Sequence, residues 1–246
     1  MKKRNNNFGS DVIPLGADQV HIWMAHFHPG LSGLDAVEGG LSASEVARAG
    51  RFRFPKDRDR YIFSTGTLRS ILGCYLDLPP AQLRLEAAGS GKSFTAHRLG
   101  GRELCFNLSH SGEWVVYAFA LERAVGIDVE QVRPMPDLEN MVEAYFSPSE
   151  EESLRRVGPD SRLRLFFQYW TRKEAYLKAR GEGLEGLLPR LDVSTLPLPA
   201  KELIPFNSAP AGDPAHWSLM DFSPDADHEA SLVVEGYNLE VELCGW

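Results

Sequence analysis

The sequence is poor in cysteine and contains no long apolar run. Its three cysteines, Cys74, Cys105 and Cys244, lie far apart and form no CxxC pair. This spacing predicts neither a disulfide framework nor a thiolate metal site, so we expect reduced thiols. No apolar stretch approaches the roughly 20 residues that a membrane-spanning helix needs. The basic start MKKRNNNFGSD is not followed by the apolar segment of a secretion signal, so we expect a soluble, cytoplasmic protein.

Positive charge is also scarce. The chain has 26 lysine and arginine residues against 34 aspartate and glutamate residues, a formal net charge of −8. A general nucleic-acid-binding protein needs a broad basic surface, so the charge argues against that class. An anionic ligand would have to meet a local cluster of positive charge. The densest basic stretch comprises Arg48, Arg51, Arg53, Lys56, Arg58 and Arg60. It suits either a solvated helix face or a cradle for a multiply phosphorylated ligand.

What is present is ample material for a core and a repeated order of elements. Hydrophobic residues make up 43% of the 246 residues, enough for one large domain or two small ones. We predict a strand over 20–28, a helix opened by the capping box SASE at 42–45, and a long helix over 56–76. A helix opened by Ser147 and a strong helix over 161–181, closed by Gly181, follow later. The predicted short strands lie at 83–87, 103–108, 114–121, 125–130, 191–195, 216–222, 230–237 and 239–244.

The order of strand, long helix and strands thus occurs twice. Laying residues 60–69 on residues 164–173 without gaps pairs two arginines, two phenylalanines and two threonines. We therefore predict an α+β fold, a pseudo-dimer of two similar α/β halves with the active site in the cleft between them. The predicted division is a flexible tail over 1–15, an N-terminal half over 16–124 and a C-terminal half over 125–246.

The stretch VGIDVEQV, residues 125–132, places two carboxylates inside an apolar, β-branched run. Side chains alternate along a strand, so Asp128 and Glu130 share one face with Gly126 while the apolar residues face a core. One interpretation is a half-buried strand with a solvated outer side. The other is a site for Mg²⁺, which binds carboxylate oxygens and keeps several waters.

The helix FFQYWTRKEAYLKARGEGL carries a second set of candidates. Trp170, Glu174 and Lys178 lie at i, i+4 and i+8 and therefore line one stripe. Alone, Glu174 and Lys178 could be an exposed ion pair of little energetic worth. If the stripe faces the acidic strand, it completes a three-acid Mg²⁺ site with a lysine ready for a phosphate oxygen.

Several further positions admit two interpretations each. Glu150 completes a capping box with Ser147, which explains it without catalysis, and it is kept as a second candidate base. Ser109 and His110 follow a strand in FNLSHSGEW, where they form either a polar turn or a phosphate contact. The absence of G-x-S-x-G spacing argues against a serine hydrolase.

The sequence argues against two further sites, a nucleotide-binding P-loop and a zinc site. The run GSGKS at 89–93 lacks the first glycine of a P-loop, although Lys92 in this turn can still reach a phosphate. His21, His26 and His28 are interpreted as non-catalytic strand residues, because they form no convincing zinc-ligand pattern.

Together, FNLSHS, VGIDVE, YFSPSE and WTRKEAYLKARGEGL, in this order and spacing, resemble the 4′-phosphopantetheinyl transferases of the Sfp type. The resemblance covers nearly the whole chain, including RFRFPKDRDRY and the Gly-Lys turn. It implies a monomer with coenzyme A in the cleft. It also implies transfer of the phosphopantetheine arm to a serine of an acyl or peptidyl carrier protein, with release of 3′,5′-ADP.

The resemblance also implies roles for the candidate residues. Asp128, Glu130 and Glu174 correspond to the Mg²⁺ ligands. Glu174 is the first choice and Glu150 the second for the base that takes the serine proton. The implied contacts of coenzyme A are Arg48, Arg60, Lys92, Ser109, His110, Asp128, Trp170, Lys173 and Lys178, with Lys178 on the α-phosphate.

The partner surface and two other functions stay open. Met135, Leu138, Met141 and Val142 have near-helical spacing and form either an apolar landing site for the carrier or part of the core. A catalytically inactive scaffold that binds carriers or coenzyme A is one alternative to the transferase. A Mg²⁺-dependent hydrolase of a diphosphate ester, which would release phosphopantetheine without a carrier, is the other.

Overall fold

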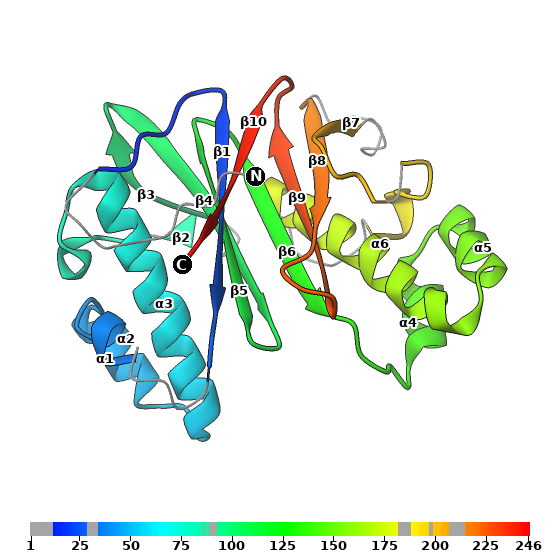
Figure 1. Cartoon of the computed structure of the whole chain (residues 1–246), viewed down its shortest axis with the longest axis horizontal. Coiled ribbons are helices and arrows are strands. Elements are labelled where there is room, and N and C mark those ends of the chain that lie inside the picture. The colour runs from blue at the N-terminus through cyan, green and yellow to red at the C-terminus, as the bar shows by residue number, and fades with distance from the viewer. Residues whose placement is uncertain are drawn as a thin grey trace.

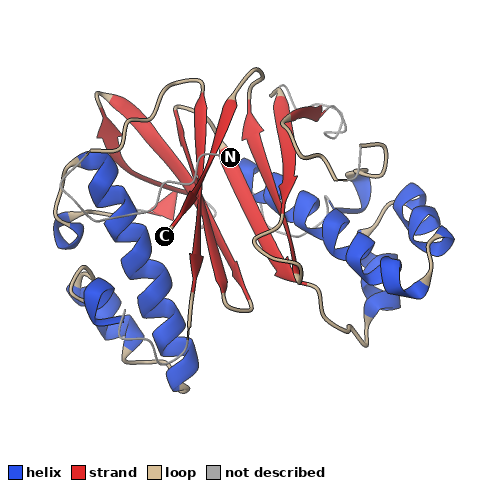
Figure 2. Cartoon of the chain, viewed as in Figure 1, coloured by secondary structure: helices blue, strands red, loops and turns tan. Residues whose placement is uncertain are grey.

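Two β-sheets lie face to face at the centre of the molecule, and helices cover their outer sides (Figures 1 and 2). The computed structural model describes residues 12–28, 34–85, 87–88, 93–181, 188–196, 199–206 and 215–246. Within these ranges no helix combines the length and the apolarity needed to cross a bilayer. The three cysteines are free thiols, as expected.

The first sheet has six strands and the second has four. The first runs in the order β10 (Glu240–Gly245), β1 (Gln19–His26), β5 (Trp114–Leu121), β4 (Arg102–Ser111), β3 (Ser93–Leu99) and β2 (Ala87–Ala88). The second runs in the order β6 (Val125–Gln131), β9 (His228–Glu235), β8 (Trp217–Phe222) and β7 (Ile204–Phe206). The two sheets and their helices confirm the predicted α+β fold of two similar halves.

The helices occupy both flanks of the molecule (Figure 2). In the first half they are α1 (Leu34–Glu38), α2 (Ala43–Ala49) and α3 (Pro55–Leu76), followed by the 3₁₀ turn η1 (Pro80–Gln82). In the second half they are α4 (Leu138–Tyr145), α5 (Pro148–Arg156) and α6 (Pro159–Arg180), followed by η2 (Leu188–Arg190). The capping boxes predicted at Ser42 and Ser147 both form. Gly181 ends α6 with φ 66°, as predicted.

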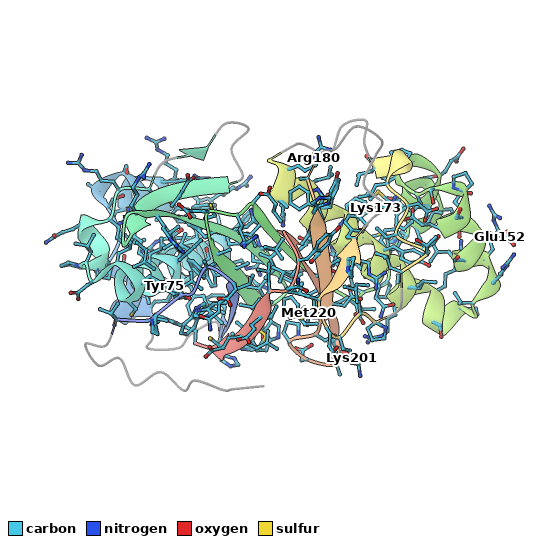
Figure 3. The ribbon with its side chains drawn as sticks, turned by 90° about the horizontal axis from the view of Figure 1, so that it is seen from above. Tyr75, Glu152, Lys173, Arg180, Lys201 and Met220 are labelled. Atoms are coloured by element: carbon cyan, nitrogen blue, oxygen red, sulfur yellow. The ribbon has the colours of Figure 1, made fainter. Side chains whose placement is uncertain are left out.

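Three apolar clusters hold the layers together. The first lies between α3 and the six-stranded sheet and includes Ile71, Tyr75 and Phe119. The second joins the two sheets, and Met220, which belongs to it, lies near the middle of the molecule in Figure 3. The third packs α6 and its neighbours onto the four-stranded sheet. Because burial of apolar surface drives folding, the middle cluster makes the two halves one body.

Corresponding contacts in the two halves agree with the predicted repeat. Arg60 of α3 donates a hydrogen bond to the backbone oxygen of Gly112, in the turn between β4 and β5. Arg164, its counterpart on α6, donates to the backbone oxygen of Ala226, between β8 and β9. Each long helix thus holds the turn of one hairpin in its own sheet.

The last strand departs from a simple division of the chain. β10 pairs in parallel with β1, with Gln19 opposite Glu240 and Met24 opposite Gly245. The predicted boundary near residue 125 falls between β5 and β6 in the sequence. β10 lies beyond that boundary in sequence but belongs to the first sheet. The chain end therefore returns to the half in which it began.

Two predicted strands differ from the structure. Residues 191–195 form no strand, because the backbone N–H and oxygen of Val193 bond to the side chains of Glu150 and Arg172. Of residues 83–87, only Ala87 is in a strand, and the backbone oxygen of Leu83 accepts a hydrogen bond from Arg69. Residue 86 lies outside the described residues. In both segments, buried side chains occupy the groups that a sheet partner would need.

Gly126 permits an unusually close approach between α6 and β6. A Cβ atom at this position would lie 2.0 Å from the backbone oxygen of Ala175 and 2.4 Å from the backbone nitrogen of Ala179. Backbone atoms cannot yield as a flexible side chain does. Gly126→Ala is therefore expected to lower the free energy of unfolding by about 1–3 kcal/mol through overpacking, as measured by urea unfolding. Gly158→Ala is the control, since a Cβ there meets no atom within 4 Å. Equal stability of the two variants would show that α6 can move away at no cost.

Candidate active site

The acidic strand β6 lies against the hydroxyl-bearing strand β4 of the other half. Ser109 donates a hydrogen bond from Oγ to Asp128 Oδ1 at 2.8 Å, and Ser111 donates from Oγ to Glu130 Oε2 at 2.7 Å. Successive residues on one face of each strand therefore meet in pairs. The apolar residues of β6 face the cluster between the sheets, as the alternation predicts. We call this contact the β4–β6 junction.

Lys178 of α6 closes the β4–β6 junction from the helix side. Its Nζ lies 2.7 Å from Asp128 Oδ1, and it donates to Ser109 Oγ at 3.0 Å and to the backbone oxygen of Ile127 at 3.2 Å. The side chain of Lys178 is 14% exposed and that of Asp128 is 5% exposed. The predicted proximity of α6 and the acidic strand is therefore present, and Gly126 supplies the space for it.

Glu174 lies one helical turn before Lys178 on the same stripe of α6. It is 8% exposed, and its carboxylate oxygen Oε1 is buried. Among the described residues, Asp128, Glu130 and Glu174 do not form a group whose ligand atoms all lie within 4.8 Å of one another. Instead, the oxygen Asp128 Oδ1 is held by Lys178 and Ser109.

The electrostatics of the β4–β6 junction favour a bound cation. Burial raises the pKa of Glu130, and the negative charge of Asp128 raises it further, while Ser111 and Lys178 act in the opposite direction. The second oxygen of Asp128, Oδ2, is buried and finds no hydrogen-bond partner among the described residues. Two repelling carboxylates and a buried oxygen without a donor are features that a divalent ion satisfies.

Basic groups from both halves surround His110 at the end of β4. Burial lowers the pKa of His110, the charges of Arg60 and Lys178 lower it further, and Asp128 raises it. His110 lies on the exposed side of β4, and the lowered pKa favours its neutral imidazole. The positive charges of Arg60 on α3 and Lys178 on α6 thus act on His110 at the end of β4, beside the acids.

Arg48 lies on α2, at the start of the basic stretch. Its guanidinium lies 5.2 Å from the centre of the Tyr61 ring, and it lines an open hollow together with Arg51 and Phe52. The face of the Tyr61 ring attracts the positive charge of this guanidinium. Lys92, the remaining basic candidate from the first half, lies outside the described residues.

Glu150 and Lys173 form a buried pair with each other. Both side chains are 0% exposed, and Lys173 Nζ lies 2.7 Å from Glu150 Oε2. Glu150 also accepts the backbone N–H groups of Ser147 and Val193, and Lys173 donates to the backbone oxygen of Leu188. Figure 3 shows Lys173 inside the second half, whereas Glu152 lies at its outer edge. Their polar atoms are thus occupied inside the C-terminal half.

Trp170 and the predicted docking residues surround the same core. The Trp170 ring stacks on Phe166 and meets Tyr145 edge-on, with ring centres 6.0 and 5.7 Å apart. Val142 is buried within the cluster beneath α6. Met135, Leu138 and Met141 pack at the edge of that cluster and are partly exposed.

Sequence reasoning missed Asn107, an uncharged residue that joins the two halves. Asn107 Oδ1 accepts a hydrogen bond from the backbone N–H of Ile127 at 3.1 Å. This contact is next to the one between Ser109 and Asp128. The alternation of Asn107 with Ser109 and Ser111 was the available signal, since three polar residues at i, i+2 and i+4 share one face of a strand.

Two family models match the chain over adjacent segments. The model described as 4′-phosphopantetheinyl transferase superfamily matches residues 124–233. The model described as 4′-phosphopantetheinyl transferase, N-terminal, matches residues 25–122. The first match contains β6 and α6 with Asp128, Glu174 and Lys178, and the second contains β4 with Ser109.

Curated relatives match over most of their own length. The 4′-phosphopantetheinyl transferase HetI of Nostoc sp. is 38% identical over 226 residues, which cover 92% of this chain and 91% of the relative. The putative 4′-phosphopantetheinyl transferase slr0495 of Synechocystis sp. is 32% identical over 203 residues, covering 82% and 78%. The 4′-phosphopantetheinyl transferase psf-1 of Bacillus pumilus is 32% identical over 214 residues, covering 84% and 78%.

Proposed function

Because the chain belongs to the 4′-phosphopantetheinyl transferase superfamily and is an enzyme of that activity, we propose the complete reaction that it performs. It transfers the 4′-phosphopantetheine arm of coenzyme A to a serine hydroxyl of an apo acyl or peptidyl carrier protein and releases 3′,5′-ADP. The observation that carries this proposal is the contact of Lys178, Asp128 and Ser109 at the β4–β6 junction. It brings a cation and an acid of one half together with a hydroxyl of the other.

Mg²⁺ is the ion that the acidic residues suit. Asp128, Glu130 and Glu174 would hold it, since they offer the hard oxygen ligands that this ion prefers. The buried oxygen Asp128 Oδ2 and the raised pKa of Glu130 support the assignment. A bound Mg²⁺ would supply positive charge beside the pyrophosphate of coenzyme A.

The residues of the chain perform the remaining steps. Lys178 binds the α-phosphate of coenzyme A, and Ser109, His110, Arg60 and Arg48 contact the other phosphates and the adenine. Glu174 takes the proton of the carrier serine, whose oxygen forms a bond to the β-phosphorus that carries pantetheine. The bond from that phosphorus to the bridging oxygen breaks, and Lys178 offsets the charge left on 3′,5′-ADP.

The other candidate residues have supporting parts. Trp170, whose ring stacks on Phe166, is assigned to the coenzyme A contacts. Lys173 is fully buried and pairs with Glu150, so its part is to hold α6 in position. Lys92 belongs to the same proposed phosphate contacts as Arg60.

Mass spectrometry of the carrier tests the proposal directly. Incubation of an apo-carrier protein with the enzyme, coenzyme A and Mg²⁺ is expected to give a carrier heavier by one phosphopantetheine, together with 3′,5′-ADP. Chelation of the metal with EDTA is expected to stop the reaction, and added Mg²⁺ is expected to restore it. Release of free phosphopantetheine without a carrier would indicate a hydrolase. Binding without any product across a panel of fatty acid, polyketide and peptide carriers would indicate a scaffold.

The partly exposed residues Met135, Leu138 and Met141 provide the docking site for the carrier. Met141→Glu is expected to raise the KM for the carrier about tenfold, because it places a negative charge where an acidic carrier lands. The KM for coenzyme A is expected to stay unchanged. Glu143→Gln, at an exposed position of the same helix α4, is the control. A shift of both KM values in Met141→Glu would mean that the substitution disturbs the core and not a docking surface.

A further inference from the structure

A second cluster of possible metal ligands lies outside the acidic site. His26 is the last residue of β1, His28 follows two positions later, and Glu113 lies in the turn between β4 and β5. One ligand atom from each of these residues lies within 4.8 Å of the other two. His26 Nε2 is 3.7 Å from Glu113 Oε2, and the centres of the two imidazole rings are 4.0 Å apart.

Backbone pairing fixes this arrangement. His26 is opposite Trp114 in the antiparallel pair of β1 and β5, and the backbone N–H of Phe27 donates to the backbone oxygen of Glu113 at 2.6 Å. In an extended chain, the side chains of residues two positions apart project to the same side. The imidazoles of His26 and His28 are therefore neighbours. Glu113 is distant in sequence and is delivered by the hairpin turn.

The surroundings of His26 hold its ring with Nε2 on the side of Glu113. The ring of Trp114 meets His26 edge-on, with centres 4.7 Å apart and an interplanar angle of 84°. His26 Nδ1 is buried and makes no hydrogen bond to any other residue in the described ranges. His28 and Glu113 are exposed, so an ion could enter from solvent and keep water ligands.

We propose that His26, His28 and Glu113 form a binding site for a divalent transition metal, with Zn²⁺ as the ion it fits best. Two imidazole nitrogens and one carboxylate oxygen are a ligand set that Zn²⁺ accepts and that Mg²⁺ does not favour. The site is thus chemically separate from the oxygen-only set of Asp128, Glu130 and Glu174. The sequence pattern alone gave no sign of this set, because Glu113 is far from the two histidines in sequence and lies in the turn between β4 and β5.

Metal binding at this position would fasten the end of β1 to the turn after β4. Gly112, next to Glu113, already accepts a hydrogen bond from Arg60, and Ser111 before it donates to Glu130. The ion would therefore stabilise the strand end that carries Ser109 and His110. Since ligands that bind only the folded state stabilise it, Zn²⁺ is expected to raise the melting temperature.

Isothermal titration calorimetry tests the site, with ZnCl₂ added to the full chain without a histidine tag. Excess Mg²⁺ in the buffer occupies the acidic site. One equivalent of Zn²⁺ is expected to bind, and His26→Gln and His28→Gln are each expected to weaken binding by about tenfold or more. His216→Gln, at an exposed histidine before β8, is the matched control and should bind as the unsubstituted protein does.

Tryptophan fluorescence gives an independent measurement. Ni²⁺, a paramagnetic ion that imidazole also binds, is expected to quench part of the emission, because His26 contacts Trp114. This quenching should vanish in His28→Gln and in Trp114→Phe, whereas Trp114→Phe should still bind Zn²⁺. No saturable Zn²⁺ binding by the unsubstituted protein, or binding by His28→Gln with unchanged affinity, would overturn the proposal.

Discussion

Glu174→Gln is expected to lower the rate of carrier modification by about 10²- to 10⁴-fold, the usual contribution of a general base. Glutamine keeps the shape of the side chain but can neither take the serine proton nor offer a charged ligand to Mg²⁺. Glu174 is 8% exposed and lies one turn before Lys178, at the edge of the β4–β6 junction. The measurement is the initial rate of mass gain of an apo-carrier at saturating coenzyme A.

Asp128→Asn is expected to have an effect of similar size for a different reason. It removes the charge that holds Lys178 Nζ at 2.7 Å and one of the proposed metal ligands. Glu152→Gln, on the exposed face of α5 where Glu152 pairs with Arg155 and Arg156, is the matched control and should be fully active. Thermal unfolding establishes that all three variants fold. Turnover near that of the unsubstituted enzyme in Glu174→Gln or Asp128→Asn would refute the assignment of these acids.

The alternation along β6 could be predicted because it depends only on the local chain. A strand repeats every two residues, so an apolar and polar alternation gives the two faces directly. Val125, Ile127 and Val129 face the other sheet, and Gly126 and Asp128 face α6. The capping boxes of α2 and α5 could be predicted for the same reason, since their partners are three residues apart.

Contacts between distant segments could not be predicted in this way. Nothing local in residues 240–245 indicates that they pair in parallel with β1. A strand with so short an apolar pattern can turn either face to the core and can pair with more than one neighbouring strand. The distance of 2.0 Å between a Cβ at Gly126 and Ala175 depends on how α6 packs, which periodicity does not specify. The same holds for Asn107, whose partner Ile127 belongs to the other half.

The buried pair of Glu150 and Lys173 combines both situations and leads to the second large effect. The capping role of Glu150 was predicted, whereas its ion pair with Lys173 joins α5 to α6 and arises only in the folded chain. Burial raises the pKa of Glu150 and lowers that of Lys173, and the opposite charge of each partner counteracts the shift of the other. Each charge is thus tolerated in the core because the other is present.

Glu150→Gln is therefore expected to lower the free energy of unfolding by about 3–5 kcal/mol, the cost of leaving one charge of a buried pair without its partner. The transfer rate per folded molecule should stay close to that of the unsubstituted enzyme, since the carboxylate does not reach solvent. Urea unfolding and the carrier assay at low temperature measure the two quantities separately. The double variant Glu150→Gln with Lys173→Met should recover part of the lost stability, because it removes the unpaired ammonium group as well. A Glu150→Gln enzyme that unfolds at the original urea concentration but no longer transfers phosphopantetheine would instead make Glu150 the base.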